Sequence, residues 1–122
     1  MNLLKTDHRG KIIAVLGTKD RTGGFTLYAN GLQELRGGEW QPFDGHYVTV
    51  RYETAGDLHR RFTATRIALV GVFALAFRKT KDDRTAFVTV DVDGQPRWAH
   101  EINPKKAGKA LAFAKRVEQA SQ

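Results

Sequence analysis

The 122-residue sequence predicts a mainly β chain that ends in one α-helix. Short β-branched and aromatic runs fill the first hundred residues, turn dipeptides rich in glycine separate them, and the apolar period becomes helical near residue 104. We expect seven or eight antiparallel strands to form a small sandwich or partly open barrel, with the helix over its open end. An OB-type barrel fits less well because its helix usually lies between strands.

Four strand-like runs lie before residue 44. They span residues 11–16, 25–29, 32–35 and 40–43. The second and third are joined by Asn30-Gly31, the dipeptide best suited to the two positive-φ positions of a hairpin turn. Residues 44–45 (DG) supply the next tight turn. The sequence leaves open whether residues 1–24 take part in the sheet.

The remaining strand-like runs lie in the middle and later parts of the chain. They span residues 46–53, 58–65, 67–78, 85–92 and 97–102. The run HYVTVRYE at 46–53 is rich in β-branched and aromatic residues, and residues 55–57 (AGD) are expected to turn the chain into the next strand. Residues 67–78 form either one strand bent at Gly71 or two strands that meet there, because an interior glycine often marks a bulge or kink.

A C-terminal helix is expected over residues 104–120. Asn103 suits the N-cap because its side chain accepts a hydrogen bond from a free backbone N–H, and Pro104 suits the first helical position. The apolar residues that follow recur at helical spacing and form one stripe. They are Ala107, Ala110, Leu111, Phe113, Ala114 and Val117. Such a stripe needs an apolar surface to cover, and the open end of the β-structure supplies one.

The composition indicates a single globular domain, residues 1–122, with 41% hydrophobic and 27% charged residues. Twenty Lys+Arg against 13 Asp+Glu give a net charge of +7. The absence of cysteine excludes disulfide frameworks, thiolate nucleophiles and zinc ribbons, and we expect a cytoplasmic protein. The longest apolar stretch, residues 67–77, is about half of the roughly 20 residues that a membrane-spanning helix needs, so we expect no transmembrane segment.

The titratable side chains form no evident catalytic or metal-binding pattern. The histidines, none of which is spaced from another as paired metal ligands are, are His8, His46, His59 and His100. The sequence Asp91-x-Asp93-Gly94 is interpreted as a turn, because the flanking acidic residues of a calcium loop are missing. Ser121, the only serine, lies in the terminal tail. We therefore expect a non-enzymatic protein without metal or cofactor, with His100 as the strongest histidine candidate.

Clustered basic residues are the remaining candidate for a binding site. One group surrounds the expected hairpin tip and the other lies at the helix start. They are Arg78, Lys79, Lys81, Arg84, Lys105, Lys106 and Lys109. A helix amino terminus carries partial positive charge and normally attracts acidic residues, so lysines at that end indicate an anion-binding or partner-binding corner. The alternative is that these exposed lysines only keep the protein soluble.

Four segments carry a resemblance to a known family. They are ETAGDLHRRFTATR (53–66), ALVGVFALAFRKTKDDR (68–84), FVTVDVDGQPRWAHEI (87–102) and KKAGKALAFAKRV (105–117). Together they resemble the short pleckstrin-homology-like (PH-like) domain proteins of actinobacteria and their phages. The resemblance implies a PH-like antiparallel sandwich or partly open barrel capped by the C-terminal helix.

Two functions are expected. PH-like folds often bind peptides or self-associate along a sheet edge or beside the terminal helix, so the resemblance implies an interaction module for a protein partner or a homo-oligomer. The alternative is an electrostatic binder of nucleic acid or anionic membrane, which would use the basic hairpin tip and helix start. The sequence has no platform of alternating aromatic and basic residues of the kind that binds single-stranded nucleic acid.

Overall fold

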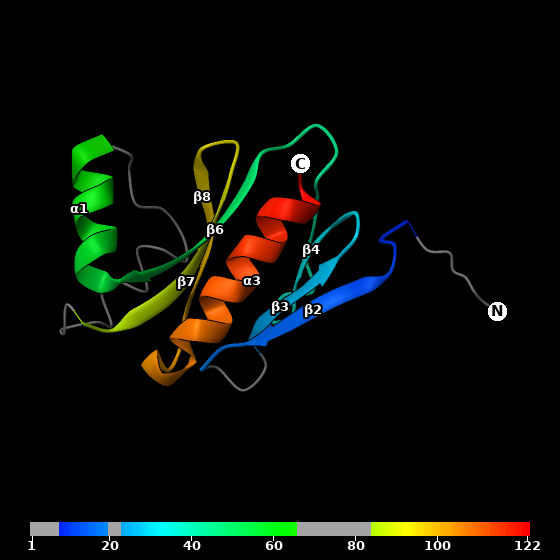
Figure 1. Cartoon of the computed structure of the whole chain (residues 1–122). Coiled ribbons are helices and arrows are strands. Elements are labelled where there is room, and N and C mark those ends of the chain that lie inside the picture. The colour runs from blue at the N-terminus through cyan, green and yellow to red at the C-terminus, as the bar shows by residue number, and fades with distance from the viewer. Residues whose placement is uncertain (1–7, 20–22, 66–83) are drawn as a thin grey trace.

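Two antiparallel sheets and a C-terminal helix dominate the computed structural model, which describes residues 8–19, 23–65 and 84–122 (Figure 1). The first sheet contains, in spatial order, β2 (Ile12–Gly17), β3 (Gly24–Tyr28), β4 (Gly31–Glu34) and β5 (Trp40–Pro42). The second contains β6 (Val48–Thr54), β7 (Ala86–Val92) and β8 (Gln95–Glu101). Helix α1 (Ala55–Thr65) follows β6, and the 3-10 turn η1 (Pro104–Lys106) leads into α3 (Ala107–Ala120).

The predicted mainly β architecture with a C-terminal helix is confirmed. Each of the seven strands in the described residues lies within two residues of a predicted strand. The question left open for residues 1–24 is answered in part, because β2 forms the edge of the four-stranded sheet. The strand or strands predicted at 67–78 lie outside the described residues.

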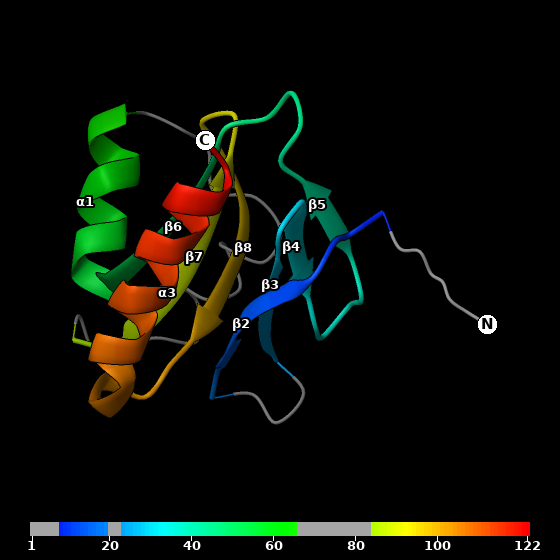
Figure 2. The same cartoon turned by 45° about the vertical axis from the view of Figure 1, so that its right-hand side comes forward.

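Helix α3 closes the open side between the two sheets. It contacts β6 of one sheet and β2 of the other, and its inner stripe of Ala110, Phe113 and Val117 is buried (Figures 1 and 2). These side chains join a single hydrophobic core to which both sheets contribute. Burial of a side chain the size of Phe113 contributes roughly 1.5–3 kcal/mol. The helix is therefore an integral part of the core.

A buried polar pair links the two sheets. His100 Nε2 of β8 lies 2.8 Å from Glu34 Oε2 of β4, and both side chains are buried. The other carboxylate oxygen, Glu34 Oε1, accepts a hydrogen bond of 2.6 Å from Gly37 N. The His100 ring also meets Phe25 edge-on, with 5.3 Å between centroids. His100, the strongest histidine candidate in the sequence, therefore has an internal structural contact between the sheets.

The strand predicted at 58–65 and the turn before it are wrong, because α1 occupies both. Thr54 Oγ1 accepts a hydrogen bond of 3.1 Å from Asp57 N, which satisfies one of the free N–H groups of the first helical turn. Side-chain hydrogen bonds from Thr54 and from the Arg60 guanidinium lower the pKa of the Asp57 carboxyl. Ala55 and Leu58 are both buried at helical spacing. The AGD sequence thus begins a helix, and α1 lies beside β6, away from the four-stranded sheet (Figure 2).

The first hairpin turn lies one residue earlier than predicted. Tyr28 pairs with Gly31, so Ala29 and Asn30 form the two-residue loop, and neither has a positive φ. Gly31 is required for a different reason. A Cβ at this position would lie 2.5 Å from Cζ2 of Trp40, so only glycine allows the indole to pack against β4.

The Glu34–His100 pair makes a prediction about stability. Replacing Glu34 by alanine leaves His100 in the core without its hydrogen-bonding partner, and we expect a loss of about 2 kcal/mol in the free energy of unfolding. Glu101→Ala is the control, because Glu101 pairs with Lys19 at 3.0 Å on the exposed surface, where such a pair contributes no more than about 1 kcal/mol. Denaturant unfolding measures both variants, and equal losses would contradict the structural role of Glu34.

Candidate functional site

Among the described strands, β6 lies at the edge of its sheet, with only β7 beside it. Asp93 N donates to Tyr47 O at 2.7 Å at one end of the β6–β7 pairing, and Ala55 N donates to Thr85 O at 2.8 Å at the other. The register between these ends is continuous. Because hydrogen-bonded pairs alternate along an antiparallel ladder, every second residue of β6 directs its N–H and C=O away from β7. These outward residues are Val48, Val50 and Tyr52.

Beside the contact between β6 and α3 lies a hollow of about 500 Å³ that residues of both elements line. Its strand side is formed by Val48, Thr49 and Val50, and its helix side by Ala114, Lys115 and Glu118. We call it the β6 groove. Its two walls supply backbone hydrogen-bonding groups on one side and an apolar and charged helix flank on the other.

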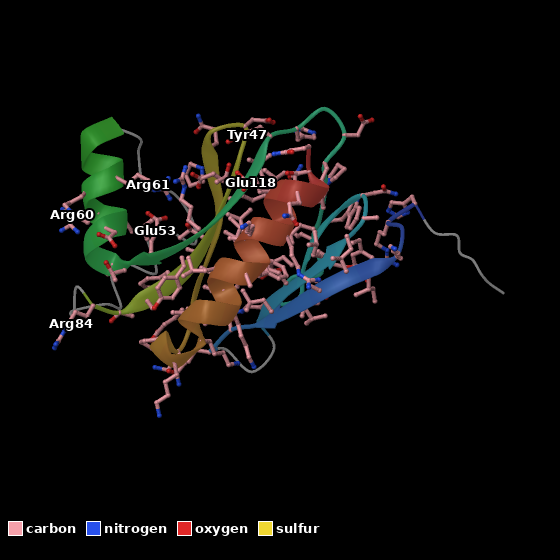
Figure 3. The ribbon with its side chains drawn as sticks, viewed as in Figure 1. Tyr47, Glu53, Arg60, Arg61, Arg84 and Glu118 are labelled. Carbon is pink, nitrogen blue, oxygen red and sulfur yellow. The ribbon has the colours of Figure 1, made fainter. Side chains whose placement is uncertain are left out.

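Tyr47 marks one end of the β6 groove. Its side chain is 71% exposed, and a second hollow of about 540 Å³ adjoins it, with Ser121 and Gln122 shared between the two. Figure 3 shows Tyr47 and Glu118 near the C-terminal end of α3, whereas Glu53 and Arg61 lie toward α1. The groove therefore runs along the first part of β6, from the exposed Tyr47 to Val50.

The other sheet edges have features that oppose pairing with another chain. Strand β2 has an irregular register between Ile12 and Ala14, and Arg116 Nη1 lies 3.5 Å from Ile13 O. Strand β5 has three residues and ends in Pro42. Strand β8 includes Pro96 and pairs irregularly with β7. By contrast, β6 has seven residues with no proline and no register shift, so it is the one regular open edge among the described strands.

A buried ionic cluster holds α1 against the β6 end of the sheet. Arg61 binds both carboxylate oxygens of Glu53, at 2.9 and 2.7 Å, and Asp91 Oδ2 at 2.7 Å. Thr89 Oγ1 donates to Glu53 Oε1 at 2.7 Å. Burial alone would lower the pKa of the Arg61 guanidinium, but the hydrogen bonds and charges of the two carboxylates outweigh it and raise the pKa. Arg61 therefore stays charged, and its contacts with Glu53 and Asp91 hold α1 against β6 and β7.

Asp93 holds the chain that enters β6. Its carboxylate accepts a hydrogen bond of 2.8 Å from Tyr47 N and lies 2.7 Å from His46 Nδ1. These two contacts lower the pKa of the Asp93 carboxyl. Asp93 and Gly94 have φ angles of 55° and 81°, which form the two-residue turn between β7 and β8. The turn interpretation of this Asp-Gly pair is confirmed, and no group of three potential metal ligands occurs within the described residues.

The predicted basic site is only partly described. Arg78, Lys79 and Lys81 lie outside the described residues. Arg84 is exposed and directly precedes Thr85, whose carbonyl accepts from the first residue of α1 (Figure 3). The three lysines at the helix start, Lys105, Lys106 and Lys109, lie in η1 and α3.

The predicted helix start is confirmed, since Asn103 Oδ1 accepts from Lys105 N at 3.0 Å. Sequence reasoning missed the β6 groove. The regular HYVTVRYE run was visible, but nothing in it shows that this strand lies at an edge.

No protein-family model, curated protein or solved structure matches the chain. Membership of the PH-like family therefore stays a prediction. Within the described residues, no helix combines the length and the apolar character needed to cross a membrane.

The Arg61 cluster predicts an unequal effect of two neighbouring arginines. Arg61→Ala leaves Glu53 buried without its cation and Asp91 with only Arg51, whose Nε lies 3.8 Å from Asp91 Oδ2, and we expect a loss of about 3 kcal/mol in the free energy of unfolding. Arg60→Ala removes an exposed contact with Asp57 three residues earlier on the same helix, and should cost less than about 1 kcal/mol. Chemical denaturation compares the two, and a larger loss for Arg60→Ala would refute the cluster.

The open edge predicts alternating amide protection along β6. We expect the amides of Val48, Val50 and Tyr52 to exchange with solvent ~10-fold faster, or more, than those of Thr49, Arg51 and Glu53, which bond to β7. Hydrogen exchange resolved by residue in dilute protein tests this. Uniform protection along the strand would mean that the edge is already paired.

Proposed function

We propose that this chain is a non-enzymatic, PH-like interaction module that binds an extended segment of a protein chain by strand addition at β6. One observation carries the proposal. Among the described residues, the regular seven-residue strand β6 has an unpaired edge, and a hollow lined by residues of β6 and α3 lies beside it. Soluble proteins usually protect such edges, so an edge left open beside a groove is typical of a docking site.

The bound segment gains affinity from main-chain hydrogen bonds and specificity from its side chains. The outward N–H and C=O groups of Val48, Val50 and Tyr52 provide the hydrogen-bonding positions. Alternate side chains of the added strand point to opposite faces. One set packs toward Ala114 and the helix flank, and the other lies beside the exposed face of β6 near Arg51. An extended segment with apolar residues at alternate positions fits these two faces best.

The titratable groups most suited to catalysis have internal contacts. His100 pairs with Glu34, and the carboxylates of Glu53 and Asp91 bind Arg61. These contacts support a binding role over an enzymatic one. The electrostatic alternative relies on Lys105, Lys106 and Lys109 at the helix start, where the first turn has no acidic residue.

Selection from a displayed library of random twelve-residue peptides tests strand addition. We expect the selected peptides to alternate apolar and polar residues and to slow exchange at the outward amides of β6. Ala114→Arg fills the groove and should weaken peptide binding about 10-fold or more. Ala112→Arg makes the same change at an exposed position of α3 that does not line the groove, so it serves as the control.

The same experiment separates the two functions. Binding by strand addition should change little between 50 and 200 mM salt, whereas six or so phosphate contacts would lose roughly 1000-fold in affinity. Equal binding by the Ala112→Arg and Ala114→Arg variants, or unchanged exchange at β6, would contradict the proposed function.

A further inference from the structure

We infer that the strand which fills the β6 groove is β6 of a second copy of this chain, paired antiparallel about a two-fold axis at Thr49. The inference rests on the proposed strand addition and names its occupant. It is carried by three kinds of self-complementarity along the groove: in the backbone, in the exposed face of β6, and in the charges on α3.

The backbone groups match themselves across this axis. In an antiparallel pair, residues with outward groups must lie opposite residues with outward groups. A two-fold axis at Thr49 places Val48 of each copy opposite Val50 of the other, so their outward groups face each other. Apolar β-branched side chains then meet on the face that α3 covers, which is a favourable cross-strand contact.

The exposed face of β6 is also self-complementary. The same axis places Thr49 opposite Thr49 of the second copy, and Arg51 opposite Tyr47. The Arg51 Nε lies 3.8 Å from Asp91 Oδ2, but the Arg51 side chain is still 47% exposed, and Tyr47 is 71% exposed. A guanidinium beside an aromatic ring is attractive, and like charges do not face each other in this register.

Charge on α3 provides the third match. Figure 1 shows α3 running opposite to β6, with its C-terminal end beside the start of the strand. Two-fold pairing therefore sets two α3 helices antiparallel on one face of a joined sheet. Lys115 and Glu118 both line the groove, and neither forms an ion pair with a described residue. Antiparallel helices place Lys115 of each copy opposite Glu118 of the other, so one pair of residues makes two contacts of opposite charge.

An exposed apolar residue extends this helix flank. Leu111 is 57% exposed and lies one helical turn before Lys115. A second copy that packs against this helix flank would bury the exposed apolar surface of Leu111.

The test is the mass of the full chain in solution across a concentration series, followed by charge reversal. Sedimentation or light scattering should show a dimer of twice 13.7 kDa that dissociates on dilution. Lys115→Glu and Glu118→Lys each place like charges together twice, so each should weaken the dimer about 10-fold. Lys109→Glu, the same change on α3 outside the groove, should leave the dimer unchanged.

Mixing the variants tests the register itself. A Lys115→Glu chain mixed with a Glu118→Lys chain restores both contacts of opposite charge, and the mixture should form a heterodimer as tightly as the unchanged protein forms its dimer. The double variant should again pair with itself. Weakening by each variant without rescue in the mixture would overturn the antiparallel pairing.

The remaining outcomes distinguish this inference from the proposed function. A chain that stays monomeric at all concentrations overturns the dimer. If that monomer still binds the selected peptides and Ala114→Arg abolishes the binding, strand addition at β6 stands. A dimer that is unaffected by Ala114→Arg, Lys115→Glu and Glu118→Lys overturns the β6 interface.

Discussion

The packing of α3 across the open side between β2 and β6 is the constraint on which the other features depend. The two sheets share one core, and the inner stripe of Ala110, Phe113 and Val117 fills the side that their strands leave uncovered. Because the helix must lie there, its outer flank runs beside the free edge of β6. The β6 groove is therefore a consequence of how the core is closed.

Two buried polar contacts determine how the surrounding parts are placed. The Glu34–His100 pair joins the sheets, and Arg61 joins α1 to Glu53 and Asp91. Desolvation offsets much of the attraction inside such pairs, whereas the loss of one partner is costly. Their main effect is thus to specify position. With α1 held at one end of β6, the other end of the strand stays open beside α3.

Periodicity predicted most of the described strands and the C-terminal helix, because both depend on local spacing of apolar residues. It failed at α1, where AGD is compatible with a turn and with a helix start, and the capping contact from Thr54 decides between them. It also gave the wrong reason for the glycine at position 31. This glycine is required because a Cβ there would clash with Trp40 on the neighbouring strand. Neither contact is visible in the residues that made the local pattern.

The candidate site also depends on contacts between distant residues, which the local sequence does not show. The distribution of charge in the sequence predicted a site at the lysines of the helix start, because the charge of each residue is known without the fold. An open edge is a property of pairing, and β6 and α3 meet although more than fifty residues separate Tyr47 from Lys115. The sequence alone determined which segments are strands or helix and which face of each is apolar. Only the tertiary structure decided which of the described strands has an open edge and which helix flank lies beside it, because strand order and helix docking arise from contacts between residues distant in the chain.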